Sequence, residues 1–430
     1  MRNIRFFICL QYFLYGLCYS LIAESIPIIF SRYLNRAEFY NLALSFIMIL
    51  SLAVNYMVGI AIDRFNKRKL YKVSFLISGF INLALGGLYF FYLKDNVVSS
   101  YLLVIGKLVL LCNGGFFYSV NYTYIQDHYK QDEYNLVNTL NQLFSEVASI
   151  VCGMALAIFL SGEKVYDFLG YKIHKSEYLE PLDGRTFIPF ILVGISAIYI
   201  LMYFLSAFMH IDNSHIENKK RSKEHATFGK YVKVIKESFD SDPNTMIYIY
   251  LAEFAIILYS VHLSSLYPRY LKEYFPESIV LYEYSWSLIS LGEICMLVLL
   301  LFFRKFILRK VAFVMVITIT LGLMLFSFDI GEFYLFFMTF MLGFQFVYVM
   351  VAKDQVIISS IPKKNLGRVH SIFRNQAVFF KVLLFWIFAT DLFAGDYRLA
   401  YLVLGIFVLM NVMGAYAFKK FKSSQLGVRA

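Results

Sequence analysis

Seven ionisable side chains lie inside long apolar stretches of this sequence. They are Glu24, Lys107, Glu146, Glu253, Glu293, Arg374 and Lys381. A charged side chain at the centre of a bilayer costs about 2.5–3.5 kcal/mol on insertion scales, so such residues normally face a bundle interior or a water-filled cavity. These seven positions are therefore the first candidates for a functional role.

The carboxylates in this set favour proton chemistry. A carboxyl group held among apolar neighbours can bind and release a proton near neutral pH, which suits a proton-coupled cycle. We take Glu24 first, then Glu253 and Glu146, as candidates for proton coupling. The alternative is structural, with some of them paired to the buried basic residues to hold helices together. Glu24 and Lys107, both expected near the outer surface, could form such a pair.

The basic residues indicate the charge of a possible ligand. Arg374 and Lys381 are seven residues apart, so they share one face of a helix. Two cations that face one cavity favour a substrate with carboxylate or phosphate groups and disfavour a purely cationic drug. The alternative is that they balance the buried glutamates.

The elements that hold these residues must be transmembrane helices. The chain of 430 residues is 60% hydrophobic and 16% charged, with a mean hydropathy of +0.64. Its charges cluster between apolar runs of about 20 residues, the length that spans a bilayer. Without water in the hydrocarbon layer, the backbone groups of each run must pair within it. We predict twelve helices, over residues 5–30, 39–62, 71–93, 101–124, 135–161, 186–209, 244–268, 279–303, 311–328, 333–352, 367–390 and 398–418.

The loops predict the topology and two halves. An even number of helices places both termini on one side, and Lys and Arg are concentrated in the loops of that side, which predicts cytoplasmic termini. We expect a six-helix N-terminal bundle over 1–209 and a six-helix C-terminal bundle over 244–418. The linker at 210–243 contains an amphipathic pattern at 228–239, typical of a helix on the inner leaflet. Residues 419–430 form a predicted cytoplasmic tail.

A charged loop joins the second and third predicted helices. It carries Gly59, Asp63, Arg64, Lys67 and Arg68 in the pattern G-x-x-x-D-R-x-x-K-R. The glycine permits close approach to a neighbouring helix, and the aspartate can cap or pair across the gap between helices. The basic residues favour the cytoplasmic side. The simpler interpretation is an ordinary positive-inside turn.

This loop resembles the signature between helices 2 and 3 of the major facilitator superfamily. Within that superfamily the chain is similar to the group of macrolide exporters, siderophore exporters and lysophospholipid transporters. The segment from Pro362 through Gly367 and Arg368 to Ser371 resembles that group's entry to helix 11. The resemblance implies two six-helix bundles around a central cavity and assigns gating roles to the glycines and charges of both loops.

The resemblance also sorts the buried charges. In that fold, helices 1, 2, 4, 5, 7, 8, 10 and 11 face the cavity, and all seven buried ionisable residues fall on these helices. Lys107, Arg374, Lys381 and Glu293 are therefore candidates to line the substrate cavity. The chain departs from the family pattern at Leu111, where a basic residue usually stands. The Gly-Pro antiporter signature of helix 5 is also missing, so drug–proton antiport is implied by the group and not by a motif.

The resemblance implies a secondary active transporter that exports a small amphipathic molecule, such as a siderophore or a drug, by proton-coupled alternating access. Three alternatives stay open: a lysophospholipid flippase, a proton-coupled importer of a small anionic solute, and a non-transporting membrane sensor. The sequence contains no phosphate-binding loop, zinc-ligand spacing or nucleophile motif, and its five cysteines lie inside predicted helices without paired spacing. We expect no enzymatic activity, cofactor or metal.

The expected partners are a small-molecule substrate, protons and the lipid bilayer. The net charge of +11 reflects the basic loops of one membrane side, so we expect no nucleic-acid partner. We expect a monomer in the inner (plasma) membrane of a bacterium.

Overall fold

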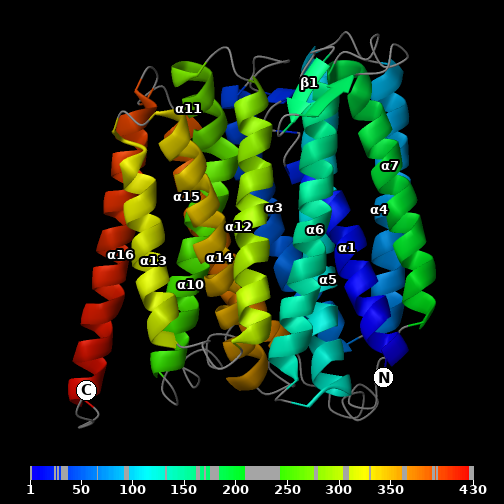
Figure 1. Ribbon diagram of the computed structural model, residues 1–430. Coiled ribbons are helices and arrows are strands. Elements are labelled where there is room, and N and C mark those ends of the chain that lie inside the picture. Colours follow the sequence, from blue (N-terminus) through cyan, green and yellow to red (C-terminus); the bar gives the residue numbers. More distant parts are fainter. Residues whose placement is uncertain are drawn as a thin grey trace.

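Twelve long helices account for most of the described residues. The computed structural model describes residues 2–23, 26, 29–30, 37–64, 66–91, 96–130, 133–160, 165–168, 171–174, 184–208, 243–275, 279–303, 309–328, 331–360, 366–389, 393 and 396–425. The helices run side by side along the length of the molecule (Figure 1). The start of the first helix and the end of the last lie at the same end of the bundle, as the even number of helices predicts.

The first half contains six of these helices. They are α1 (Arg2–Ala23), α3 (Ala37–Arg64), α4 (Lys67–Phe91), α5 (Asn96–His128), α6 (Tyr134–Leu160) and α7 (Gly184–Leu205), with the short η3 (Ser206–Phe208) after α7. A small antiparallel hairpin, β1 (Val165–Phe168) with β2 (Tyr171–His174), lies between α6 and α7 and pairs Val165 with His174. It occupies the end of the bundle opposite the chain termini (Figure 1).

The second half contains the other six. They are α10 (Pro243–Val261), α12 (Ile279–Phe302), α13 (Arg309–Leu325), α14 (Glu332–Ser360), α15 (Leu366–Ala389) and α16 (Tyr397–Gln425). Helix α10 continues through one π-helical turn, η4 (His262–Leu266), into α11 (Tyr267–Tyr274). By length and composition, seven helices of the described part could cross a membrane, and four more contain shorter apolar runs.

Several helices present one apolar face to the outside of the bundle. On α16 the exposed large side chains recur every three or four residues along one stripe: Leu399, Val403, Ile406, Met410, Met413 and Tyr416. Water would not favour such a surface, whereas lipid chains would. The stripe therefore marks the side of α16 that contacts the hydrocarbon of the bilayer.

Several helix boundaries differ from the prediction. Helix α14 does not end at residue 352 but continues to Ser360, because Val356, Ile357 and Ile358 extend its buried apolar face beyond the charged residues Lys353 and Asp354. Helix α16 continues to Gln425, so the first part of the segment expected as a tail is helical. The amphipathic segment predicted at 228–239 lies outside the described residues.

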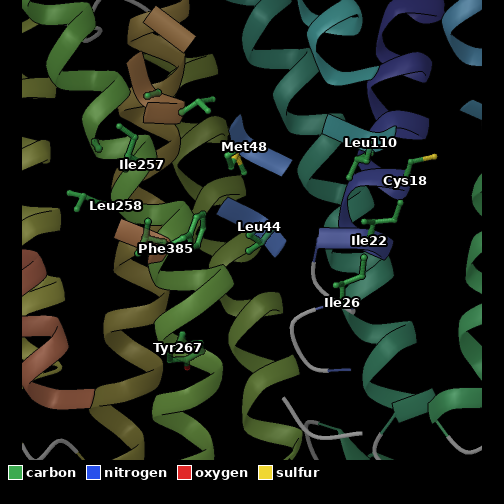
Figure 2. Close-up of a cluster of buried hydrophobic side chains, with 14 of the residues drawn as sticks. Cys18, Ile22, Ile26, Leu44, Met48, Leu110, Ile257, Leu258, Tyr267 and Phe385 are labelled. Atoms are coloured by element: carbon green, nitrogen blue, oxygen red, sulfur yellow. The ribbon is translucent and has the colours of Figure 1, made fainter. Parts of the chain in front are cut away.

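The two halves meet along two helix pairs. Helix α3 packs on α15, and α6 packs on α12. One cluster of buried apolar residues extends across the boundary between the halves. Figure 2 shows its centre, where Leu44 and Met48 of α3 lie toward Phe385 of α15. Because lipid is as apolar as these side chains, close packing rather than water exclusion holds such helices together.

Glycines permit the closest helix approach, within the second half. A Cβ atom at Gly292 of α12 would overlap the carbonyl oxygen of Phe340 on α14, and one at Gly343 of α14 would overlap the carbonyl oxygen of Ile289 on α12. The two backbones therefore touch directly. Small residues at such contacts are typical of membrane helix packing.

Candidate functional site

Three buried ionisable side chains meet between α10 and α14. The Nζ atom of Lys353 lies 2.9 Å from Oε1 of Glu253 and 3.6 Å from Oδ1 of Asp354. The three side chains are only 7%, 9% and 2% exposed, in the order Lys353, Glu253, Asp354. We call these three residues the ionic cluster.

The ionic cluster holds more acid than base. Lys353 neutralises one carboxylate, so the fully ionised cluster carries one negative charge in the protein interior. An uncompensated buried charge is costly, and the cost falls when the group binds a proton or a cation. The cluster is therefore suited to respond to protons.

The ionic cluster also joins the two halves. The hydroxyl group of Tyr122, on α5 of the first half, donates a hydrogen bond to the carboxylate of Asp354. The ring of Tyr122 is buried in an apolar cluster whose other buried members, among them Met246 and Val347, come from the second half. Its ring centroid lies 6.3 Å from that of Tyr118 on the same helix. A charge-assisted contact therefore fastens α5 to α14.

We predict that Tyr122→Phe weakens this connection while keeping the buried ring. A hydrogen bond to a charged group contributes about 1.5–3 kcal/mol, so its loss should shift the equilibrium toward separated halves by about tenfold or more. Spin labels at His128 and Ser359, near the ends of α5 and α14, would show a larger population at long distance. Tyr101→Phe, an exposed position on the same helix, is the matched control and should leave the distances unchanged. An unchanged distribution in Tyr122→Phe would contradict the predicted role.

A second polar contact joins α6 of the first half to α12 of the second. The hydroxyl of Ser290 donates to Oε2 of Glu146 across 3.4 Å. The side chains of Glu146 and Glu293 are hydrogen-bonded to each other. From α10, the hydroxyl of Tyr259 donates to Oε1 of Glu293 across 2.7 Å. The ring of Tyr259 stacks on Phe346 with centroids 3.7 Å apart, which encloses the contact on one side.

A third contact lies at the opposite end from the chain termini. The carbonyl oxygen of Phe388 on α15 accepts a hydrogen bond of 2.8 Å from the guanidinium of Arg269 on α11. The same oxygen accepts a bond of 3.5 Å from the side-chain amide of Asn41 on α3. Polar contacts thus join the halves at three depths, and each combines groups from both halves.

The structure brings some of the sequence-predicted residues together and leaves others apart. It brings Glu146 and Glu293 into direct contact, and it puts Glu253 in the ionic cluster, six residues or about 9 Å along α10 from Tyr259. Lys107 is buried in α5 and Lys381 is half-buried in α15. Glu24 and the side chain of Arg374 lie outside the described part, so the proposed pairing of Glu24 with Lys107 stays a prediction.

The loop motif between α3 and α4 is partly described. The guanidinium of Arg68 donates a hydrogen bond to the carbonyl of Ala207 in η3. Basic side chains commonly bind the free carbonyl groups at the C-terminal end of a helix. Asn66 caps α4, because its Oδ1 accepts from the backbone N–H of Lys69 at 3.0 Å. Gly59 lies within α3. The side chains of Asp63, Arg64 and Lys67 lie outside the described set, as does that of Arg368; Gly367 lies in the first turn of α15.

Sequence reasoning missed three charged residues of these contacts. Lys353 and Asp354 lie just beyond the predicted helix 333–352, although the apolar residues 356–358 signal that the helix continues. Arg269 lies just beyond the predicted helix 244–268, which ended at Pro268. Proline is well tolerated in a first helical turn, and here it lies at the start of α11. Among the described residues, no group of three or more His, Cys, Asp and Glu side chains could hold a metal ion.

Comparison with known proteins identifies relatives of this architecture. A family model described as Major Facilitator Superfamily matches residues 8–378. No curated protein sequence matches the chain. The human organic anion transporter MFSD10 (TETRAN) is 11% identical, with a TM-score of 0.68 over 96% of this chain and 99% of that chain.

Two further solved structures are similar. The proton:xylose symporter XylE is 13% identical, with a TM-score of 0.65 over 97% of this chain and 96% of that chain. The nucleoside transporter NupG is 12% identical, with a TM-score of 0.60 over 97% and 99%. At these identities the likeness concerns the fold, and it agrees with the predicted all-α arrangement of two six-helix bundles.

Proposed function

Because this chain belongs to the Major Facilitator Superfamily and is a multi-pass secondary transporter, we propose that it exports a small amphipathic molecule in exchange for protons. The observation that carries the proposal is the ionic cluster, a buried group with one more carboxylate than ammonium that is bonded to the other half through Tyr122. Asp354 thereby joins Glu253, Glu146 and Glu24 as a candidate for proton coupling.

The ionic cluster supports a simple coupling scheme. With Asp354 ionised, its carboxylate accepts the hydrogen bond of Tyr122, and the halves are held together at this depth. A proton on Asp354 removes the negative charge and weakens both this bond and the attraction to Lys353. The first half can then move away from the second, which alternates access to a site between them. Proton release restores the contact.

The side chains around the cluster support an amphipathic substrate. Tyr12 and Tyr118 lie beside Tyr122, with ring centroids of Tyr12 and Tyr118 6.3 Å apart. Such rings offer apolar faces together with hydroxyl groups. The basic residues Lys107, Arg374 and Lys381, predicted from the sequence to line the cavity, favour a substrate that also carries an anionic group. A siderophore and an amphipathic drug both fit this description.

Proton-coupled import is the second candidate. It is supported by the fold shared with XylE, which is described as a proton:xylose symporter. The same ionic cluster would serve either direction, because a coupled cycle runs along whichever gradient is larger. A lysophospholipid flippase or a membrane sensor has no comparable support from the described contacts.

We predict that Asp354→Asn abolishes proton-coupled export, because an amide cannot bind and release a proton at physiological pH. The measurement compares metabolites in cells and medium for a strain lacking the gene, under iron starvation, after return of the wild-type or the variant gene. A chelator should stay in the cells with Asp354→Asn and reach the medium with the wild type.

The control is Glu273→Gln, a carboxylate on α11 outside the polar contacts described above, which should restore secretion fully. Full secretion by Asp354→Asn would contradict the coupling role. Equal secretion with and without the gene would contradict siderophore export and leave import and drug export to be compared directly.

A further inference from the structure

The contact between Glu146 and Glu293 has a chemical property that the ionic cluster lacks. We propose that these two carboxyl groups share one proton in this state, and that the shared proton fastens α6 of the first half to α12 of the second. The proposal deepens the proposed function and rests on it, since a proton-responsive contact between the halves matters only if the halves move. It is a second proton-dependent contact, distinct from the ionic cluster.

Contacts from three helices bring the two carboxyl groups together. Ser290 and Glu293 are three residues apart on α12, so they lie on one face of that helix. Glu146 reaches this face from α6, accepting from the hydroxyl of Ser290 at 3.4 Å and hydrogen-bonding to Glu293. Oε1 of Glu293 accepts from Tyr259 of α10 at 2.7 Å. Three helices thus hold the pair in register.

The contact between the two acids favours one bound proton. An ionised carboxylate only accepts hydrogen bonds, so two ionised carboxylates cannot bond to each other. Ser290 donates to Glu146 and Tyr259 donates to Glu293, so each acid also accepts from a hydroxyl group. A hydrogen bond between the two acids needs a proton on one of them. Two like charges at this distance would instead repel, which is why paired carboxyl groups commonly retain one proton.

The surroundings of the two carboxyl groups determine how strongly they repel each other when the proton is lost. Glu293 is 4% exposed, and Leu263, Ile289 and Phe346 form a small buried cluster with Tyr259 beside it. The titratable groups near the pair include the hydroxyl of Tyr259 from α10, and Tyr19 of α1 lies near Tyr259. Glu293 is buried and Glu146 is half-buried, so water screens the two carboxylates only in part, and two charges here would repel each other. Loss of the shared proton should therefore separate α6 from α12.

Glutamine provides a direct substitute for the shared proton. A side-chain amide at either position donates a hydrogen bond to the remaining carboxylate, and it does so at every pH. Glu146→Gln and Glu293→Gln should each keep the two helices together where the wild-type pair opens. The ionic cluster would behave differently, because its lysine retains an attractive charge after deprotonation of its acids.

The experiment measures the contact between α6 and α12, which we call the seam, without substrate and without a proton gradient. Spin labels at Val151 on α6 and Leu291 on α12, both exposed side chains, report the separation of the helices in a cysteine-free protein in lipid nanodiscs. We expect the wild-type distance to lengthen as pH rises. Glu146→Gln and Glu293→Gln should hold the short distance throughout, and Glu273→Gln should follow the wild type.

Infrared spectroscopy of the wild-type protein provides a readout that does not depend on a variant folding. It should show the carbonyl band of a protonated carboxylic acid, and the band should disappear over the pH range in which the distance lengthens. A wild-type distance that is independent of pH, or a glutamine variant that opens like the wild type, would overturn the proposal. If the seam responds to pH while Asp354→Asn secretes normally, the seam proposal stands and the coupling role of Asp354 fails.

Discussion

Lys353→Met is expected to destabilise the folded protein by about 3–5 kcal/mol and to abolish transport. Removing one member of a buried ion pair leaves the partner charge uncompensated, which is the source of this cost. Lys353 faces both Glu253 and Asp354, so its removal leaves two carboxylates without their cation. The fully ionised cluster would change from one negative charge to two. Thermal unfolding of the purified protein in detergent micelles measures the change in stability.

A double variant tests whether charge is the cause. Glu253→Gln combined with Lys353→Met returns the ionised cluster to one negative charge, so it should recover most of the stability lost in the single variant. It should not recover transport, because the remaining acid has lost the partner that attracts it. Lys272→Met, at an exposed lysine on α11, should change stability by less than about 0.5 kcal/mol. If Lys353→Met unfolds at the wild-type temperature, the cluster does not carry the energetic role assigned to it.

Gly292→Ala should be the most disruptive single methyl addition on α12. The new Cβ would overlap the carbonyl oxygen of Phe340 and lie 3.0 Å from the backbone nitrogen of Phe344, so the backbone of α14 must move. Overpacking of this kind typically costs about 1–3 kcal/mol, and a rigid backbone obstacle places it at the upper end. Gly343→Ala should behave alike, because its Cβ would meet the backbone of Ile289.

Gly194→Ala is the matched control on α7. Nothing lies within 4 Å of its new Cβ, and alanine is favoured over glycine inside a helix by about 0.5–1 kcal/mol. The control should therefore unfold at the same or a slightly higher temperature, whereas Gly292→Ala should unfold well below the wild type. Equal melting of the two variants would show that α12 and α14 can separate without cost.

The helices could be predicted from the sequence because membrane insertion leaves a strong signal. Each span needs an apolar run of sufficient length, and all twelve predicted runs contain a helix of the structure. The prediction was wrong where polar residues continue a helix, as at Lys353 and Asp354 in α14. A helix end and a buried ion pair both place charges after an apolar run, and only the apolar residues that follow distinguish them.

The sequence predicted several residues of the candidate site, but it did not predict which of them contact one another. Glu146, Glu253 and Glu293 stand out because a carboxylate inside a span is costly. Glu146 was assigned to proton coupling and Glu293 to a substrate cavity, yet their side chains touch. Their contact depends on how α6 packs on α12, which joins residues far apart in the chain and leaves no spacing to detect. The partnership of Tyr122 with Asp354 escaped prediction for the same reason.

The direct contact between the backbones of α12 and α14 has a thermodynamic consequence. Glu293 lies on one of these helices, and Lys353 and Asp354 lie on the other. Because the backbones of the two helices touch at Gly292 and Gly343, with no side chains between them, the two helices should move together as one body. Any displacement that alters proton affinity at Glu293 then alters it at Asp354. By reciprocity, a proton bound at either place changes the affinity at the other by the same factor, so the two carboxyl sites should titrate cooperatively.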